Sequence, residues 1–322
     1  MIKEIVGRIE KEIAQLNFPE QLPDLYNPIS YSLSAGGKRI RPLLLMISSR
    51  IFGVNDEASI HQALGIEIFH NFTLVHDDIM DNAPLRRGKP SVYKKWNQNT
   101  AILSGDVMFS ISLQEISKCD KELLPDVLKT FLDMTVKVCE GQQMDMDFEE
   151  RTYVNMPEYI KMIELKTAYL LAGSLKIGAI LGRASRETTI AMFDFGIKIG
   201  TAFQLMDDYL DVYGDPEKFG KQVGGDIIAG KKTFLFIETL KNLPDNDKLN
   251  FERMFASEDL NSKSKVEGIK EYYEKSGANE IIREKADKLL LSAQQILNSI
   301  EGNDKAKEEL INLTLQLTNR DK

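Results

Sequence analysis

The amino-acid sequence predicts an all-α protein, and two observations predict it. Apolar residues recur at helical spacing along nearly all of the 322 residues, and no series of alternating strands separated by turns can be found. Neither a linker rich in Pro, Gly and Ser nor a change of composition divides the chain. We therefore expect a single domain over residues 1–322.

The first half of the chain contains two clear helical patterns. Residues 1–15 mix charged and apolar side chains at helical spacing, which indicates an amphipathic helix and not a signal peptide. A second helix is expected to start near Ser59, a good N-cap, and to stop at Ala83 and Pro84. Its last turns carry the acidic segment HDDIMD.

Two further helices are predicted in the middle of the chain. One begins with Pro157 in its first turn and contains Lys166 and Thr167, followed by small residues that permit close helix packing. The other runs from about Thr189 to residue 213, with Gly214 as its C-cap, and carries a second acidic segment, MDDYLD. Residues 244–276 are the most polar stretch and predict surface helices and loops.

Composition excludes several classes of protein. The net charge of −8, from 41 basic and 49 acidic side chains, argues against a general nucleic-acid-binding protein, which needs a basic face. No apolar run approaches the ~20 residues of a membrane-spanning helix. Cys119 and Cys139 are too few for a disulfide framework, and we expect them to be reduced core residues. A cytoplasmic protein is expected.

The sharpest signal is a DDxxD pattern that occurs twice, with its first aspartates at positions 77 and 207. Residues four apart lie on one face of a helix, so Asp77 with Asp81 and Asp207 with Asp211 form carboxylate pairs. Like charges at this spacing repel unless a cation lies between them. Mg²⁺ typically takes one or two protein carboxylates and completes its shell with water and substrate phosphate oxygens. Two such clusters indicate a metal-bound diphosphate; the alternative for either alone is a solvated helix end.

Five motifs in order resemble those of the trans-isoprenyl diphosphate synthases, also called polyprenyl synthetases. They are GGKRIRP at 36–42, HDDIMDNAPLRRG at 76–88, GQQMD at 141–145, FQLMDDYLD at 203–211 and GGDIIAGKKT at 224–233. The resemblance covers most of the chain. It implies one polyprenyl synthetase domain with the isoprenoid synthase fold: a bundle of long helices around a central apolar cavity, with the two acidic motifs facing each other across its top. It also implies a homodimer.

The resemblance implies a role for each matching residue. Two or three Mg²⁺ ions would be bound by Asp77, Asp81 and Asp207, supported by Asp78, Asp208 and Asp211. The allylic diphosphate would be held by Arg86, Lys166, Lys221 and Lys231, with Thr167 and Gln204 near the reacting carbons. Isopentenyl diphosphate would be held by fixed cations and an imidazole, namely Lys38, Arg41, His70 and Arg87. Gln142 and Asp145 match a pair on the cavity wall.

Some of these residues have simpler explanations when taken alone. Lys38 and Arg41 could be surface charges after a turn, and His70 on an apolar helix face could be a core histidine. His70 nevertheless lies seven residues before Asp77, two turns away on the same face. His61 and His76 lack such a relation and are expected to be structural.

The implied reaction joins isopentenyl diphosphate to an allylic diphosphate. The allylic diphosphate ionises with help from Mg²⁺ and cationic side chains, the double bond of isopentenyl diphosphate attacks the cation, and a proton is lost, with the released diphosphate as the base. No protein nucleophile is required. In the family, bulk at positions 72 and 73 limits the growing chain, so Phe72 beside Thr73 indicates C20 geranylgeranyl diphosphate, with C15 farnesyl diphosphate as the alternative. Phe72 could instead pack in the core.

Two other functions fit the sequence less well. A terpene cyclase shares an aspartate-rich motif, but its second motif mixes Asn, Ser or Thr and Glu, and it needs no second diphosphate pocket. A non-catalytic partner subunit usually loses acidic residues, whereas both motifs are complete here.

Overall fold

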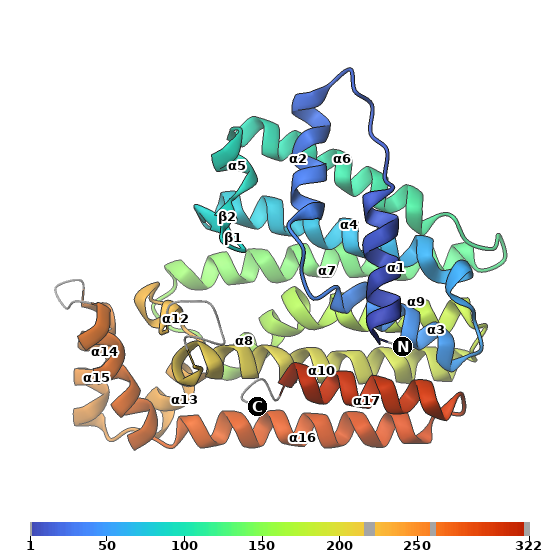
Figure 1. Cartoon of the computed structure of the whole chain (residues 1–322). Coiled ribbons are helices and arrows are strands. Elements are labelled where there is room, and N and C mark those ends of the chain that lie inside the picture. Colours follow the sequence, from blue (N-terminus) through green and yellow to red (C-terminus); the bar gives the residue numbers. More distant parts are fainter. Residues whose placement is uncertain (1, 216–222, 258–261, 319–322) are drawn as a thin grey trace. The chain divides into compact units, whose positions relative to one another are not determined.

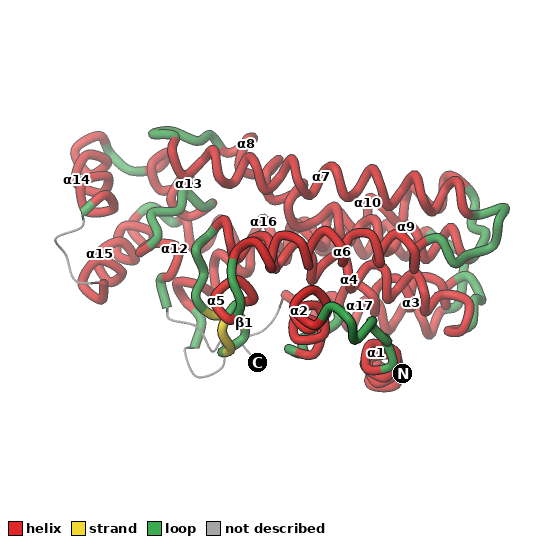
Figure 2. The backbone as a smooth tube through the Cα atoms, turned by 90° about the horizontal axis from the view of Figure 1, so that it is seen from above, coloured by secondary structure: helices red, strands yellow, loops and turns green. Residues whose placement is uncertain are grey.

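The computed structural model describes residues 2–215, 223–257 and 262–318. Most of them lie in helices and very few in strands, which confirms the expected all-α class (Figures 1 and 2). They form two compact units, each drawn from three stretches of the chain. Unit 1 comprises Met1–Leu132, Gly173–Ile190 and Gly302–Leu310, and unit 2 comprises Asp133–Ala172, Ala191–Glu301 and Ile311–Lys322. No helix among the described residues is long and apolar enough to span a bilayer.

Unit 1 contains the N-terminal helices and one short hairpin. Its elements are α1 (Ile2–Ala14), α2 (Pro23–Ser34), α3 (Ile40–Ile51), α4 (Asp56–Met80), β1 (Leu85–Arg86), β2 (Lys89–Pro90), α5 (Val92–Lys95) and α6 (Gln98–Ile116). Four helices contain the points where the chain passes from one unit to the other: α7 (Leu124–Glu150), α9 (Tyr169–Leu181), α10 (Arg186–Tyr213) and α17 (Asp304–Thr318).

Helix α4 is the centre of unit 1 and packs against α3 and α6 (Figure 1). Close approach to α6 depends on Gly65, since a Cβ there would lie 2.7 Å from Ile116 Cγ1. The hydroxyl of Ser112 on α6 donates to the carbonyl of Gly65 at 2.7 Å. The tight contact between the two helices fixes the direction in which α4 presents its acidic last turn.

The segment after the first acidic motif forms a two-stranded antiparallel hairpin. Leu85 pairs with Pro90 and Arg86 pairs with Lys89. The two turn residues, Arg87 and Gly88, have φ values of 52° and 75°. Positive φ at both positions is what a type I′ turn requires, and Gly adopts it without strain. The hairpin therefore presents Arg87 at its tip.

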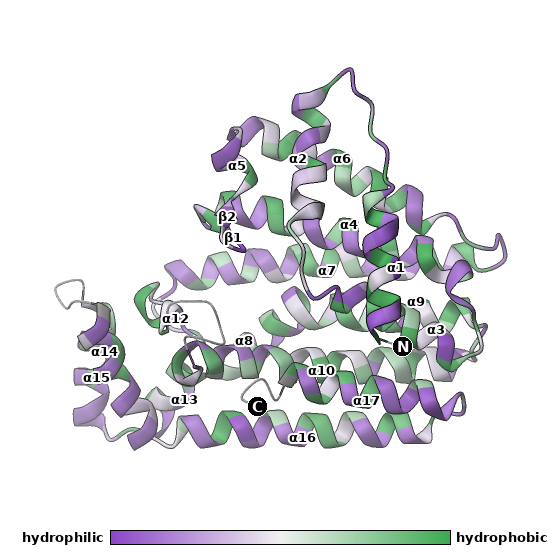
Figure 3. Cartoon of the chain, in the orientation of Figure 1, coloured by the Kyte–Doolittle hydropathy of each residue, from purple (hydrophilic) through white to green (hydrophobic). Residues whose placement is uncertain are grey.

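Unit 2 is built around a second core. Its further elements are α8 (Met156–Ile163), the π-helix η1 (Glu164–Ala168), α12 (Gly225–Ile228), α13 (Phe234–Asn242), α14 (Asp245–Ala256), α15 (Ser262–Lys275) and α16 (Ala278–Ser299). Helices α14 and α15 are largely hydrophilic (Figure 3). They nevertheless bury Phe251, Ile269 and Tyr273 in this core, so residues 244–276 are more than the surface segment that their polarity predicts.

Small residues bring the helices of unit 2 close together, as the sequence predicts. A Cβ on Gly196 or Gly200 of α10 would lie 2.3 Å or 2.5 Å from the Cα atoms of Ala172 and Ala168. A Cβ on Gly141 of α7 would lie 2.3 Å from the backbone nitrogen of Lys166. These contacts bring α7 and α10 against the segment that carries Lys166 and Thr167.

Several local predictions need correction. Helix α4 begins at Asp56 with Asn55 as its N-cap, because the Asn55 side chain accepts a bond from the nitrogen of Ala58; Ser59 lies buried inside the helix. Helix α4 ends at Met80, before the proline. The predicted helix from Pro157 is interrupted by the π-turn η1. Cys139 is exposed and Cys119 is half-buried, so neither is a core residue.

Candidate active site

The turn at residues 36–39 positions the cations of unit 1. Gly36 and Gly37 have positive φ values of 76° and 139°, and Arg39 adopts a left-handed conformation at φ 47°. A Cβ on Gly37 would lie 2.8 Å from Cζ of Arg87, so the absence of a side chain lets the hairpin guanidinium lie against this turn. Lys38 is exposed beside it.

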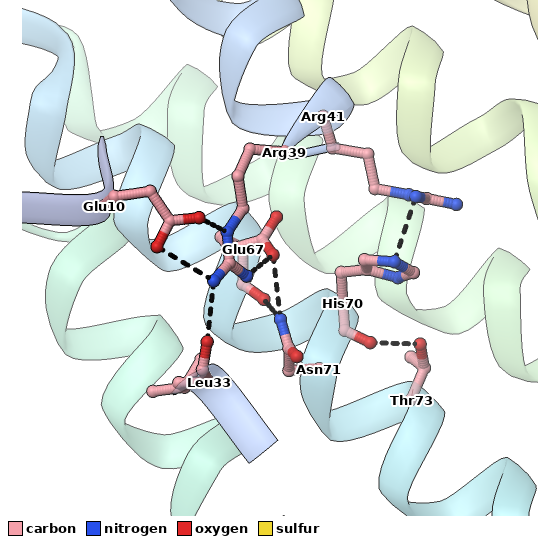
Figure 4. A network of polar contacts seen from close by, with 8 residues as sticks. All are labelled: Glu10, Leu33, Arg39, Arg41, Glu67, His70, Asn71 and Thr73. Atoms are coloured by element: carbon pink, nitrogen blue, oxygen red, sulfur yellow. Dashed lines mark hydrogen bonds and ion pairs between the residues drawn. The ribbon is translucent and has the colours of Figure 1, made fainter. Parts of the chain in front are cut away.

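Arg41 and His70 meet on the facing sides of α3 and α4 (Figure 4). The guanidinium Nη1 of Arg41 lies 3.0 Å from Nε2 of His70. Because Arg41 only donates, Nε2 accepts, and the ring proton lies on Nδ1. Burial, reinforced by the charges of Arg41 and Arg87, lowers the pKa of His70 well below its ordinary value. His70 is therefore a neutral group within a cluster of cations.

Arg86 and Asp78 form an ion pair behind the first acidic motif. Nε and Nη2 of Arg86 donate to Oδ1 of Asp78 at 2.9 Å and 2.5 Å. Burial raises the pKa of Asp78, and the bond from Arg86 partly offsets this shift. A pocket of unit 1 is lined by Tyr31, Asn71, Asp78, Arg86, Arg87 and Pro90, among others. The middle aspartate of the motif thus has a protein partner.

The outer residues of this motif lie on the last turn of α4. Asp77 is half-buried, and Asp81 is exposed as the C-cap. Phe72 lies earlier on the helix, with its ring 5.7 Å from that of Phe109 and 4.7 Å from that of His76. The hydroxyl of Thr73 donates to the carbonyl of His70 at 2.8 Å.

A second pocket lies within unit 2 and gathers most of the predicted residues of that unit. Its lining includes Asp145, Lys166, Thr167, Gln204, Asp208 and Lys231. Lys166 and Thr167 belong to the π-helix η1, an element that is rare and frequent at functional sites. Nζ of Lys166 donates to Oδ2 of Asp145 at 2.5 Å.

A chain of hydrogen bonds orders the wall of this pocket. The hydroxyl of Thr167 donates to Oε1 of Gln204 at 3.0 Å, and Nε2 of Gln204 donates to Oδ1 of Asp208 at 3.1 Å. The buried hydroxyl of Tyr159 donates to Oδ2 of Asp208. Burial and the nearby charge of Asp226 raise the pKa of Asp208 well above its ordinary value. The bond that Gln204 donates to Asp208 fixes the orientation of the Gln204 amide.

The GGD segment packs against the end of the second acidic motif. The nitrogen of Asp226 donates to Oδ2 of Asp211 at 3.0 Å, and the nitrogen of Gly224 donates to the carbonyl of Asp211 at 2.6 Å. Gly224 has a φ of 77°, and a Cβ there would lie 2.4 Å from Val266. Nζ of Lys232 donates to the carbonyl of Phe148 at 3.1 Å. Asp226 and the two lysines of the GKK sequence thereby join the pocket wall.

The two units divide the predicted residues between them. Unit 1 brings Arg41, His70 and Arg87 to the 36–39 turn, and unit 2 brings Lys166, Thr167, Gln204 and Lys231 to one pocket. Asp208 lines that pocket, whereas Asp207, Asp211 and the buried Gln142 do not. Lys221 lies outside the described residues. His61 bonds to Glu115, and His76 bonds to the carbonyl of Ile102, in agreement with structural roles.

The unit 2 pocket includes residues that the sequence did not single out, among them Tyr159, Asp226 and Lys232. Asp226 and Lys232 belong to the GGDIIAGKKT motif, so the motif itself could have identified them. Tyr159 stands in no motif. Only the fold brings its hydroxyl from α8 to Asp208 on α10.

Helix-borne aspartates next to clustered arginines and lysines are typical of an enzyme that binds phosphorylated substrates. A sequence profile described as polyprenyl synthetase matches residues 22–274. The chain is 40% identical over 304 residues to a short chain isoprenyl diphosphate synthase of Methanothermobacter thermautotrophicus, covering 94% of this chain and 91% of that one. It is 40% identical over 244 residues to a geranylgeranyl diphosphate synthase of Methanosarcina mazei, covering 74% and 75%.

A crystal structure of a geranylgeranyl pyrophosphate synthase superposes with a TM-score of 0.95 at 38% identity, covering 100% of this chain and 99% of that one. The chain belongs to the polyprenyl synthetase family. It is a prenyltransferase with the isoprenoid synthase fold.

Proposed function

We propose that the chain condenses isopentenyl diphosphate with allylic diphosphates and that its main product is C20 geranylgeranyl diphosphate. The observation that carries the proposal is the separate cation cluster of unit 1, made by Arg41, His70 and Arg87. A terpene cyclase, which binds one diphosphate, has no use for it. The names of the similar proteins favour the same activity and the C20 product.

The two polar centres bind different substrates. Lys38, Arg41, His70 and Arg87 bind isopentenyl diphosphate, because fixed cations and an imidazole suit a diphosphate that carries no metal. Lys166 and Lys231, with Arg86 and Lys221, bind the allylic diphosphate. Lys166 reaches this role by exchanging its carboxylate partner Asp145 for substrate oxygens.

The acidic motifs fit magnesium by the chemistry of their donors. All six aspartates offer the hard carboxylate oxygens that Mg²⁺ prefers. Asp78 and Asp208 are buried, whereas Asp77, Asp81, Asp207 and Asp211 are less buried. In residues 2–215, 223–257 and 262–318, no three carboxylate, imidazole or thiol groups form a complete metal site. Mg²⁺ would be held by Asp77, Asp81 and Asp207 and by substrate oxygens, and it would stabilise the charge on the leaving diphosphate.

The chain's own residues act on both charges that ionisation creates. When the allylic C–O bond breaks, its electron pair leaves with the diphosphate, whose new charge Lys166 and Lys231 stabilise. Thr167 and Gln204 lie beside the carbocation, where the ordered dipole of the Gln204 carbonyl favours positive charge. The double bond of isopentenyl diphosphate attacks, and the released diphosphate takes the proton that is lost.

Product length rests on Phe72, the larger side chain before the first acidic motif. Its ring is half-buried between α4 and α6, where it contacts Phe69 and Phe109. We propose that this ring stops the growing chain at C20. Farnesyl diphosphate, C15, is the second candidate, because the same aromatic side chain would stop a shorter tail if the tail entered at a steeper angle.

Two features concern the whole assembly. The profile match at 22–274 crosses both units, and the two units alternate along the chain, so we infer one polyprenyl synthetase domain over residues 1–322.

We also infer a homodimer, for which exposed Ile102 and Leu103 on α6 offer apolar surface. Light scattering coupled to size-exclusion chromatography measures the mass of the assembly.

The decisive experiment incubates the purified protein with Mg²⁺, labelled isopentenyl diphosphate and C5, C10 or C15 allylic diphosphates in turn. Dephosphorylated products are then sized by chromatography. We expect elongation from each starter to C20. Cyclic products would identify a terpene cyclase, and no condensation with any starter would identify a partner subunit.

A further inference from the structure

We propose that Arg39, held by Glu10 of the N-terminal helix and by Glu67, is a positioning residue for the isopentenyl diphosphate pocket. The inference rests on the proposed function of Lys38, Arg41, His70 and Arg87. It adds a residue of α1, which lies outside the segment 22–274 that matches the family.

Arg39 is the middle basic residue of the GGKRIRP motif, yet it points away from its two neighbours. Its side chain is 0% exposed, whereas Lys38 is exposed and Arg41 is half-buried. The left-handed backbone of Arg39, at φ 47°, turns the chain between them. A non-glycine residue keeps such a conformation only where its surroundings hold it. The contacts of the side chain therefore fix the turn.

Four hydrogen bonds hold the guanidinium of Arg39 (Figure 4). Nε and Nη2 donate to the two carboxylate oxygens of Glu10 at 2.7 Å and 3.3 Å. Nη1 donates to Glu67 at 2.5 Å, and Nη2 also donates to the carbonyl of Leu33 at 2.6 Å. The bonds to Glu10 are bidentate, which fixes the plane of the guanidinium as well as its place. One side chain thus joins α1, the end of α2 and α4 to the start of α3.

Glu67 connects this anchor to His70. It lies three residues before His70 on α4, and its Oε1 also accepts a bond from Asn71 at 2.9 Å. Arg39 therefore sets the distance between the start of α3, which carries Arg41, and the turn of α4 that carries His70. The bond between Arg41 and His70, 3.0 Å long, depends on that distance.

Glu10 is not redundant with Glu67. Burial alone would disfavour the charge of Arg39, but the hydrogen bonds from Arg39 to Glu10 and the charges of Glu67 and Glu10 outweigh it and raise the pKa of Arg39. Without Glu10, Glu67 would be left as the one carboxylate bonded to this buried cation among the described residues. The guanidinium would then lose its fixed orientation, and the turn at 36–39 would loosen.

The test measures steady-state kinetics of full-length Glu10→Ala with isopentenyl diphosphate and C15 farnesyl diphosphate. Glu12→Ala removes the same charge from the same helix, at a position that does not reach Arg39, and is the matched control. The Glu10 side chain is 42% exposed, so its removal leaves the fold intact. Arg39→Lys, which keeps the charge and loses the bidentate contact, is the second variant.

We expect Glu10→Ala to raise the KM for isopentenyl diphosphate by about three- to tenfold, since one charge-assisted anchor is lost at a distance from the ligand. The kcat and the KM for farnesyl diphosphate should stay within about twofold of wild type. Arg39→Lys should show the same pattern with a larger rise. Binding of isopentenyl diphosphate alone, by isothermal titration calorimetry, should weaken in parallel.

If both KM values or kcat alone change, or if Glu10→Ala behaves as Glu12→Ala does, Arg39 has only a structural role. The melting temperature of each variant separates loss of folded protein from loss of affinity. A wild-type enzyme that neither binds nor condenses isopentenyl diphosphate would refute the proposed function itself.

Discussion

Each unit has a polar centre next to its own copy of the DDxxD pattern. The charged groups that shift pKa values in the two centres differ in sign. In unit 1, burial and the surrounding arginines favour the neutral form of His70, so that the pKa of the imidazole is lowered. In unit 2, burial and nearby carboxylates favour the neutral form of Asp208, so that the pKa of this carboxyl group is raised. The DDxxD motif alone therefore does not determine which groups near it have raised or lowered pKa values.

The middle aspartates show the difference most directly. Asp78 is bonded to a cation, Arg86, whereas Asp208 is bonded to two neutral donors, Tyr159 and Gln204. Arg86 offsets the burial of an ionised Asp78, whereas burial and the charge of Asp226 raise the pKa of Asp208 despite the bonds from Tyr159 and Gln204. A cationic centre suits a bare diphosphate, and a mixed centre of lysines and carboxylates suits a diphosphate with metal ions.

Replacing four aspartates with asparagine, one at a time, tests whether the outer aspartates of each motif contribute more to catalysis than the middle ones. Asp77→Asn and Asp207→Asn should lower kcat/KM by about a thousandfold, because a metal carboxylate contributes several kcal/mol to the transition state. Asp78→Asn and Asp208→Asn should lower it by about tenfold, since they act through neighbours. Steady-state kinetics at saturating Mg²⁺ measures all four. Equal losses at the four positions would contradict the division.

Removing each middle aspartate's partner tests the electrostatic contrast. Arg86→Met leaves the 3% exposed carboxylate of Asp78 without its cation and should lower the free energy of unfolding by about 2 kcal/mol, a value reduced because Arg86 is 37% exposed. Tyr159→Phe should cost about 1 kcal/mol, because Asp208 keeps Gln204 and binds a proton readily. Urea unfolding at pH 7 measures both values. A loss from Tyr159→Phe as large as that from Arg86→Met, or larger, would contradict the contrast between the two carboxyl groups.

Much of this contrast was available from the sequence, because the motifs are local. Helical spacing predicted α4 and α10, and the small residues after Thr167 predicted the close packing of the helix that carries them. The resemblance assigned Lys166, Lys231 and Arg86 to one diphosphate, but Arg86 lies with Arg87 in the unit 1 pocket.

What the sequence did not predict depends on contacts between distant segments. Tyr159 lies 49 positions from Asp208, and Arg39 lies 29 positions from Glu10. The π-turn at Lys166 arises where α7 and α10 both press on one segment through glycines, a constraint that no local pattern carries. The hairpin at 85–90 was missed because two-residue strands are too short to show alternation.

The two acidic motifs also differ in the size of the side chain five residues before them. It is the half-buried Phe72 in unit 1 and the fully buried Ala202 in unit 2. Phe72→Ala makes the two positions alike and should shift the main product by about one C5 unit, from C20 toward C25, because ~7.5 Å of helix separates the ring from Asp77. Chromatography of dephosphorylated products measures the shift. Phe109→Ala, a half-buried phenylalanine on α6, is the control; equal lengthening there would assign the limit to the aromatic cluster as a whole.

The smallest expected effect concerns the pH dependence that burial and the arginines impose on His70. In the folded chain, the pKa of His70 lies below its ordinary value of about 6.5. As the pH falls below 6.5, His70 therefore takes up a proton in the unfolded chain before it does so in the folded chain. The stability that neutral His70 contributes is therefore complete above this pH and is lost as the pH falls toward the folded-state pKa.

Between pH 7 and 5.5, the wild type should lose about 1 kcal/mol more than His70→Gln, whose amide can still accept from Arg41. Urea unfolding across this range measures the difference, and His61→Gln should keep the wild-type loss. Parallel curves for wild type and His70→Gln would mean that the arginines do not hold the imidazole neutral, and the contrast between the two centres would then rest on Asp208 alone.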